Sequence, residues 1–272
     1  MTFSDKERAD IERLFADMAD AVTRRTLSLA PERWGETTGM GADGTPTKLV
    51  DQVAEDEARA VLDQSGFDFS LVSEECGAIE RGGDWWIVLD PVDGTTNAAR
   101  GIPYYCTTLA LGRRSTDDVV YGLTRNIPTG ETFSAWRGAG VRRNGHPVRA
   151  APFPREERPT FALVLGKRAN ATALKLAGMR ANVRALGAAA LDLALVASGA
   201  LELYYHGYGS LRVTDIAAGV LFVREAGGVV LDGEGKPLAM PLTLAPRSTV
   251  LAVGDPSALA PEGPLASLGV PG

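Results

Sequence analysis

Histidine, cysteine and long apolar runs are scarce in this 272-residue sequence, and each scarcity argues against a class of protein. Two histidines, His146 and His206, are too few for a histidine-rich zinc site and make a Ser-His-Asp hydrolase improbable. Two cysteines, Cys76 and Cys106, form no spaced motif, so we expect reduced thiols in a cytoplasmic protein. No run approaches the roughly 18–20 apolar residues of a membrane span, and the charged N-terminus lacks an apolar signal core. Any catalysis is therefore expected to depend on carboxylates.

Basic residues are also outnumbered. The chain has 28 Lys and Arg against 34 Asp and Glu, a net charge of −6. Phosphate backbones favour basic surfaces, so we expect neither nucleic-acid nor membrane partners. An acidic protein that handles small phosphates needs metal ions between itself and its ligand. The hydrophobic content of 45% is typical of globular chains, and the length allows one large domain or two lobes in close contact.

The most informative stretch is IVLDPVDGTTN, from Ile87 to Asn97. Its apolar start predicts a strand that ends at Asp90 and is broken by Pro91. Asp93 follows, Gly94 frees the backbone, and the Thr-Thr-Asn sequence is typical of a helix start. Two carboxylates at the end of a strand, beside N–H groups that can face an anion, suit a divalent cation next to a phosphate.

The N-terminal part predicts two helices, over 4–29 and 47–64. Ser4 and Glu7 have the spacing of a capping box. Asp51 lies on the apolar face of the second helix, where it is either a paired structural residue or a catalytic one. Between the helices, the glycine-rich segment around Asp43 is either a surface loop or a mobile lid that carries an acid.

A strand over 69–77 is expected to end in Glu74 and Glu75, and in a strand only one of them could face a shared site. Pairing with the strand at 84–89 would bring Glu74 near Asp90. Short strands with Gly, Pro and Asn turns over 104–149 predict an antiparallel meander. We therefore expect a first lobe over 1–151 with helices on an antiparallel sheet.

The residues after a Pro-rich linker at 152–159 alternate between strand and helix patterns and predict a second lobe over 160–254, followed by a tail at 255–272. In this lobe, a late helix is expected to start with Thr214 as N-cap and Asp215 in its first turn. The expected class is therefore α+β to α/β.

If the lobes face each other, four carboxylates converge on one point, namely Glu74, Asp90, Asp93 and Asp215. Without cations they would repel one another and raise one another's pKa values. The N-terminal position of Asp215 on its helix would by itself have a structural explanation. An all-oxygen ligand set favours Mg²⁺, with Mn²⁺ as a substitute.

These segments resemble the inositol monophosphatase-like, lithium-sensitive phosphatase superfamily. The motifs are SEE at 73–75, DPVDGTTN at 90–97 and TDIAAGVLFVREAGG at 214–228. GADGTPTKLVD and LRVTD are most similar to the archaeal-type dual fructose-1,6-bisphosphatase/inositol-1-phosphatases. The resemblance implies a layered αβαβα sugar-phosphatase fold, a homodimer, and direct in-line hydrolysis of a phosphate monoester without a phosphoenzyme.

The resemblance also implies residue roles. Glu74, Asp90 and the Val92 carbonyl would bind a first metal, and Asp90, Asp93 and Asp215 a second. Asp43 would help to hold a third ion. Asp51, with Thr95 and the first-metal ligand Glu74, would activate the attacking water. The residues implied in substrate binding are Asp93, Gly94, Thr95, Arg184, Gly187, Ala188, Ala189 and Tyr208.

Tyr208 stands where many relatives have an acid that binds inositol hydroxyls, so fructose 1,6-bisphosphate remains a candidate beside inositol 1-phosphate. The alternatives are a 3′-phosphoadenosine-nucleotide phosphatase and a non-catalytic regulatory member of the fold. For Lys48, Glu75 and Arg212 two roles stay open: a purely structural one, or one in which they hold the site residues in place.

Overall fold

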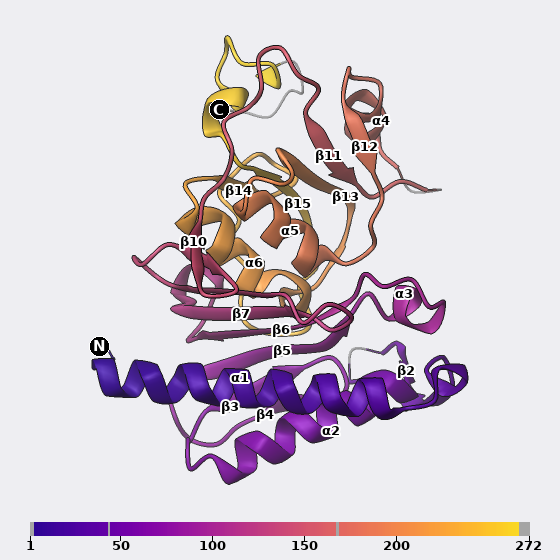
Figure 1. Cartoon of the computed structure of the whole chain (residues 1–272), viewed down its shortest axis with the longest axis vertical. Coiled ribbons are helices and arrows are strands. Elements are labelled where there is room, and N and C mark those ends of the chain that lie inside the picture. Colours follow the sequence, from indigo (N-terminus) through magenta and orange to yellow (C-terminus); the bar gives the residue numbers. More distant parts are fainter. Residues whose placement is uncertain (1–2, 43, 167–168, 267–272) are drawn as a thin grey trace.

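The computed structural model describes residues 3–42, 44–166 and 169–266. Its elements form five layers, αβαβα, which confirms the predicted class (Figure 1). Two helices cover the outer face of an eight-stranded sheet, two further helices lie between this sheet and a five-stranded sheet, and α4 covers the far side. Asp43 lies outside the described residues.

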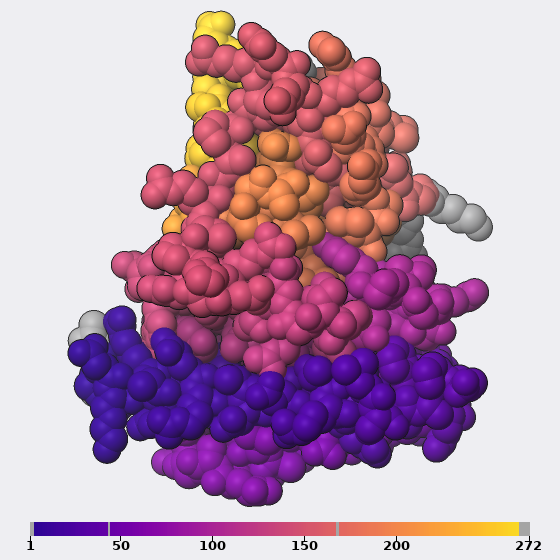
Figure 2. Space-filling view, viewed as in Figure 1, coloured from indigo at the N-terminus to yellow at the C-terminus, as the bar shows by residue number. Residues whose placement is uncertain are grey.

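The outer layer consists of α1 (Asp5–Ser28) and α2 (Leu49–Gln64). Both predicted helices are confirmed, as is the capping box: the Glu7 N–H donates to Ser4 Oγ at 3.3 Å, and the Ser4 N–H donates to the Glu7 carboxylate at 2.7 Å. The apolar residues of α1 repeat at helical spacing and are buried against the sheet. Figure 2 shows α1 as a band across this face of the molecule.

The larger sheet has the order β10-β9-β8-β7-β6-β5-β3-β4. Its strands are β3 (Ser70–Ser73), β4 (Gly77–Ile79), β5 (Trp86–Asp93), β6 (Cys106–Gly112), β7 (Tyr121–Asn126), β8 (Thr132–Trp136), β9 (Val141–Arg143) and β10 (His146–Val148). The predicted meander is confirmed from β6 to β10. A short hairpin, β1 (Thr37–Met40) with β2 (Pro46–Lys48), flanks the glycine-rich segment before α2.

The prediction that β5 ends at Asp90 is wrong, because the strand continues to Asp93. Asp90 pairs with Thr108 and Asp93 with Cys106, so β5 has one more residue than β6 between these pairs. This is a β-bulge, in which Pro91 need not donate to the ladder. The Val92 N–H instead donates to Asp90 Oδ1 at 3.0 Å. The bulge keeps both aspartates at the same end of the strand.

The second sheet has the order β12-β11-β13-β15-β14. Its strands are β11 (Thr160–Leu163), β12 (Asn182–Arg184), β13 (Leu203–Leu211), β14 (Val229–Leu231) and β15 (Ser248–Val253), and α4 (Ala171–Ala177) packs on its outer face. β15 pairs with both β13 and β14 and was not predicted from the sequence. The register of β13 shifts between His206 and Leu211, so Tyr208 lies in an irregular segment, against the His206 ring.

The middle layer consists of α5 (Ala189–Ala197) and α6 (Val213–Glu225). Every residue of α6 from Val213 to Val223 is buried. The surrounding hydrophobic cluster draws side chains from both sheets, including Phe133 from the first and Tyr204 from the second. Where α5 and α6 cross, a Cβ on Gly219 would lie 2.5 Å from Leu193, so only glycine allows this close approach. The middle layer thereby joins the two sheets into one packed unit. The lobe boundaries at 151 and 160 stay a prediction.

No helix in the described ranges combines the length and apolar character needed to cross a lipid bilayer.

Candidate active site

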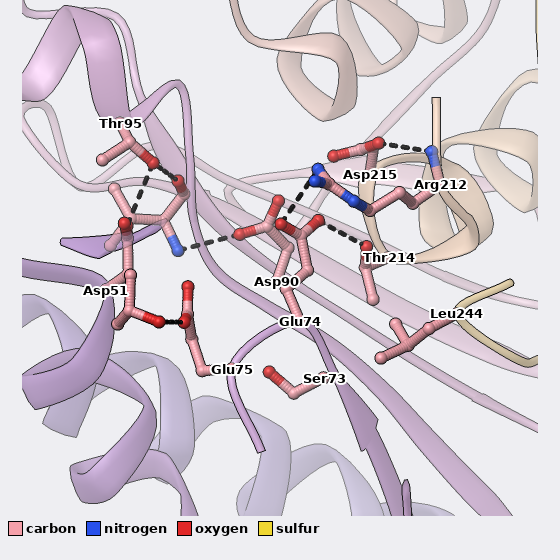
Figure 3. Close-up of polar contacts among 12 residues, drawn as sticks. Asp51, Ser73, Glu74, Glu75, Asp90, Thr95, Arg212, Thr214, Asp215 and Leu244 are labelled. Atoms are coloured by element: carbon pink, nitrogen blue, oxygen red, sulfur yellow. Dashed lines mark hydrogen bonds and ion pairs between the residues drawn. The ribbon is translucent and has the colours of Figure 1, made fainter. Parts of the chain in front are cut away.

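A cavity of about 650 Å³ opens where β3 and β5 end and α6 begins. Because β3 and β5 run parallel, their carboxyl ends meet at one sheet edge, which confirms the expectation that Glu74 lies near Asp90. The N-terminus of α6 reaches the same edge from the middle layer and adds Asp215 (Figure 3). Three segments far apart in sequence thus contribute acids to one site.

Carboxylate oxygens of Glu74, Asp90 and Asp215 lie within 4.8 Å of one another. Asp93 also lines the cavity, and its Oδ2 accepts a hydrogen bond from the Ala190 N–H at 2.7 Å. Burial, followed by repulsion from Glu74, raises the pKa of Asp90 well above its usual range. Burial and the charge of Asp215 do the same to the pKa of Asp93. Burial also raises the pKa of Asp215, against the lowering effect of the Arg212 N–H.

Burial and mutual repulsion thus both disfavour the charged forms of these acids, which a bound cation would offset. Oxygen is the donor atom of all the clustered side chains, and the one nearby thiol, Cys106, is fully buried behind Asp93. This donor set fits a hard divalent cation. The predicted convergence of the acids is therefore found in the structure, with Glu74, Asp90 and Asp215 as its closest members.

Beside the cluster, the Thr95 hydroxyl lies 3.0 Å from Asp51 Oδ1 and 3.0 Å from the Val92 carbonyl oxygen. Asp51 is 7% exposed, and burial together with the Glu75 charge raises its pKa to about 7. Because Glu74 and Glu75 were predicted to lie in a strand, only one of them was expected to face the site. That expectation is wrong, because β3 ends at Ser73 and both acids line the cavity from the following turn.

The backbone at Gly94 is left-handed and closely surrounded. Gly94 has φ +92° and precedes the five-residue helix α3 (Thr95–Ala99). A Cβ at Gly94 would approach the Tyr104 carbonyl oxygen to 3.1 Å, so the residue is confined by its surroundings as well as by its dihedral angles. The predicted helix start at Thr95 is confirmed.

The second lobe forms one wall of the cavity through Gly187. Asn97 holds this wall in place, because its Nδ2 donates to the carbonyl oxygens of Tyr104 and Leu186, both at 2.8 Å. The other predicted substrate residues do not line the cavity: Ala188 and Ala189 are buried behind Gly187, and neither the exposed Arg184 nor Tyr208 reaches it. Asn97 was predicted only as part of the helix start, and its hydrogen bonds to Tyr104 and Leu186 were not predicted from the sequence.

The prediction of Thr214 as N-cap of α6 is wrong, because the N-cap is Arg212, two residues earlier, and the helix begins at Val213. The Thr214 hydroxyl instead donates to Glu74 Oε1 at 2.8 Å, and the Arg212 guanidinium lies 3.0 Å from Glu74 Oε2. Arg212, Lys48 and Arg100 are the basic side chains that line this cavity.

Comparison with known proteins agrees with this geometry. Residues 13–262 match the model of the inositol monophosphatase family. The chain belongs to this family. The chain is 36% identical to a fructose-1,6-bisphosphatase/inositol-1-monophosphatase of Methanothermobacter thermautotrophicus, over 88% of this chain and 90% of that one. It is 32% identical to a bifunctional NADP phosphatase/NAD kinase of Methanococcus maripaludis, over 81% of this chain and 43% of that one.

A solved inositol monophosphatase–fructose 1,6-bisphosphatase superposes with a TM-score of 0.81 at 24% identity, over 91% of this chain and 96% of that one. At this identity the likeness shows the fold alone. The layered sugar-phosphatase fold expected from the sequence motifs is thus confirmed, and the site described above lies within the family-matched residues.

Proposed function

We propose that this protein is a Mg²⁺-dependent phosphomonoesterase that hydrolyses fructose 1,6-bisphosphate and inositol 1-phosphate to the alcohol and inorganic phosphate. The observation that carries the proposal is one cavity with two parts: the cluster of Glu74, Asp90 and Asp215, and the adjacent Thr95–Asp51 pair. The first part suits cations that neutralise a phosphate, and the second suits the handling of a water molecule.

In this proposal, Glu74, Asp90 and the Val92 carbonyl hold one cation, and Asp90, Asp93 and Asp215 hold another. Asp43, outside the described residues, helps to hold a third. Cations bound there would supply positive charge that neutralises the phosphate dianion, acidifies the attacking water and stabilises the leaving oxygen. The donor set leaves Mn²⁺ as a substitute for Mg²⁺.

The protein's own groups perform the remaining steps. Asp51 accepts a proton from the attacking water, and its pKa of about 7 suits a general base near neutral pH. Thr95 holds that water in line through its hydroxyl. The backbone N–H groups of Gly94 and Thr95 bind the phosphate oxygens that do not react. Water oxygen bonds to phosphorus as the ester P–O bond breaks, and the leaving alkoxide takes up a proton to become the alcohol.

The substrate assignment is supported by the relative from Methanothermobacter and by Tyr208, which replaces an acid implied in inositol binding. In the same proposal, Asp93 and Gly187, which line the cavity, bind the rest of the substrate, whereas Arg184, Ala188 and Ala189 lie outside the cavity wall and are not assigned to it. The protein acts as a homodimer by analogy with the family, which light scattering coupled to size-exclusion chromatography would test. The lobes are taken as 1–151 and 160–254, with a tail at 255–272.

The direct test is phosphate release, with Mg²⁺ present, from a panel of four compounds. Fructose 1,6-bisphosphate and inositol 1-phosphate should be hydrolysed with higher kcat/KM than 3′-phosphoadenosine 5′-phosphate and NADP⁺. Hydrolysis of the nucleotides alone would overturn the substrate assignment and leave the phosphatase mechanism standing. Turnover of none of the four would favour a non-catalytic member of the fold.

A further inference from the structure

Two residues at the junction of β13 and α6, Arg212 and Thr214, hold the acid Glu74 in the turn after β3. Arg212 approaches Glu74 Oε2 at 3.0 Å, and the Thr214 hydroxyl donates to Glu74 Oε1 at 2.8 Å. The Arg212 N–H also donates to Asp215 Oδ2 at 2.6 Å. Figure 3 shows the guanidinium reaching from the side of Asp215 toward Glu74. Both oxygens of Glu74 are therefore engaged by this one segment.

The two contacts on Glu74 differ in charge. Arg212 brings a full positive charge to a cluster in which three carboxylates lie within 4.8 Å of one another. The side chains of Arg212 and Glu74 are only 19% and 15% exposed, so solvent screens this pair less than a surface ion pair. Thr214 contributes a neutral hydroxyl that fixes orientation only. The guanidinium is thus a resident counter-charge of the cluster.

We infer that Arg212 is a positioning residue that sets how tightly this protein binds divalent cations. It holds Glu74 next to the start of α6, and a cation that binds Glu74 does so against the positive charge of the guanidinium. The arginine therefore stabilises the fold before metal binding and weakens metal binding by the same contact. Thr214 holds the other oxygen of Glu74 in place without adding charge. This inference rests on the proposed metal site and adds the residue that tunes it.

The test is calorimetric titration of the chelator-treated full chain with Mg²⁺ alone, for wild type and R212Q. Removal of one nearby positive charge should tighten Mg²⁺ binding about tenfold. The metal-free variant should also melt a few degrees lower, because Glu74 loses its partner. The thermal stabilisation at saturating Mg²⁺ should consequently be larger for R212Q than for wild type. If R212Q does not fold without metal, its Mg²⁺ dissociation constant can be measured instead by withdrawing Mg²⁺ from the loaded variant with a competing chelator.

T214V is the matched control, because it removes the hydrogen bond to the other oxygen of the same carboxylate without a change in charge. It should lower the metal-free melting temperature and leave Mg²⁺ affinity equal or weaker. R212K, which keeps the charge, should bind Mg²⁺ more nearly as wild type does. Unchanged or weaker Mg²⁺ binding by R212Q would overturn the inference and leave Arg212 a structural residue. A wild-type protein that binds no Mg²⁺ at all would instead overturn the proposed metal site.

Discussion

The Thr95 hydroxyl is equidistant from two acceptors, 3.0 Å from Asp51 Oδ1 and 3.0 Å from the Val92 carbonyl oxygen. It has one proton to donate, so only one of these acceptors can receive it at a time. The hydroxyl can thereby exchange partners and orient a water molecule between Asp51 and the cation site. Through these two contacts, Thr95 links Val92 in the bulge of β5 to Asp51 on α2.

The first prediction concerns this pair. D51N should lower kcat by about 10²- to 10⁴-fold, the usual contribution of a general base. T95V should lower kcat as well, by a smaller factor, because the base remains while the water loses its orientation. Both changes should leave Mg²⁺ affinity within about twofold, which calorimetry would measure, since neither side chain is assigned to the metal. T96V removes the neighbouring, exposed hydroxyl and should keep near-normal kcat; a full rate in D51N would rule out the assigned base.

The second prediction concerns Asp93. D93N should abolish detectable phosphate release while the metal-free protein melts at an equal or higher temperature. Removal of one charge relieves repulsion in the buried cluster, and the amide oxygen of asparagine can still accept from the Ala190 N–H. Activity and thermal melting would be measured on the same preparation. Substantial turnover by D93N would contradict the two-cation arrangement.

The third prediction concerns Gly94. G94A adds a Cβ about 3.1–3.2 Å from Tyr104, Ala188 and Tyr105 and forces alanine to φ +92°. We expect a loss of about 2–3 kcal/mol in the free energy of unfolding and a raised KM, because the phosphate cradle shifts. Gly130 has φ +73° with no atom near its missing Cβ, so G130A measures the dihedral cost alone, about 1 kcal/mol. If G94A and G130A lose the same free energy of unfolding in urea, the neighbours of Gly94 can move aside without cost, which would contradict this prediction.

The fourth prediction concerns a buried pair behind the site, in which the Tyr104 hydroxyl donates to Asp192 Oδ1 at 2.7 Å. Burial raises the pKa of Asp192 from 3.8 to about 7. Between these values the folded state holds a proton that the unfolded state has lost. The stabilisation is therefore complete below about pH 4 and lost as pH rises through 7.

D192N should remove the part of the pH dependence of stability that Asp192 causes. At pH 7.5 the metal-free variant should be more stable than wild type by up to a few kcal/mol. The asparagine oxygen can still accept from Tyr104. Urea unfolding of both proteins at pH 5, 6 and 7.5 would show the curves diverging. D56N, on the exposed face of α2, is the control and should run parallel to wild type; a D192N curve parallel to wild type would contradict the burial argument.

Local patterns predicted most of the elements. The capping box and apolar stripe of α1, the turns of the meander and the helix start at Thr95 all depend on neighbours in sequence, and all are confirmed. The convergence of Glu74, Asp90 and Asp215 could also be predicted from the sequence, because strand ends and a helix N-terminus are recognisable positions for acids.

Long-range pairing explains the errors. β15 has an ordinary short apolar run, and only its place between β13 and β14 makes it central. β5 passes Pro91 because the bulge against β6 frees that position from the ladder. The contacts of Arg212 and Thr214 with Glu74 join the start of α6 to the turn after β3, and no local pattern indicates such a partner.

The burial of α6 has a consequence for the catalytic cycle. A clam-shell motion that parted the two sheets would expose buried side chains of α6 between Val213 and Val223 to water, and each large apolar side chain so exposed costs about 1.5–3 kcal/mol. Substrate entry and product release must then proceed with the two sheets as one rigid frame. Any gating has to come from light, peripheral parts of the chain at the rim of the cavity, such as the β1–β2 hairpin.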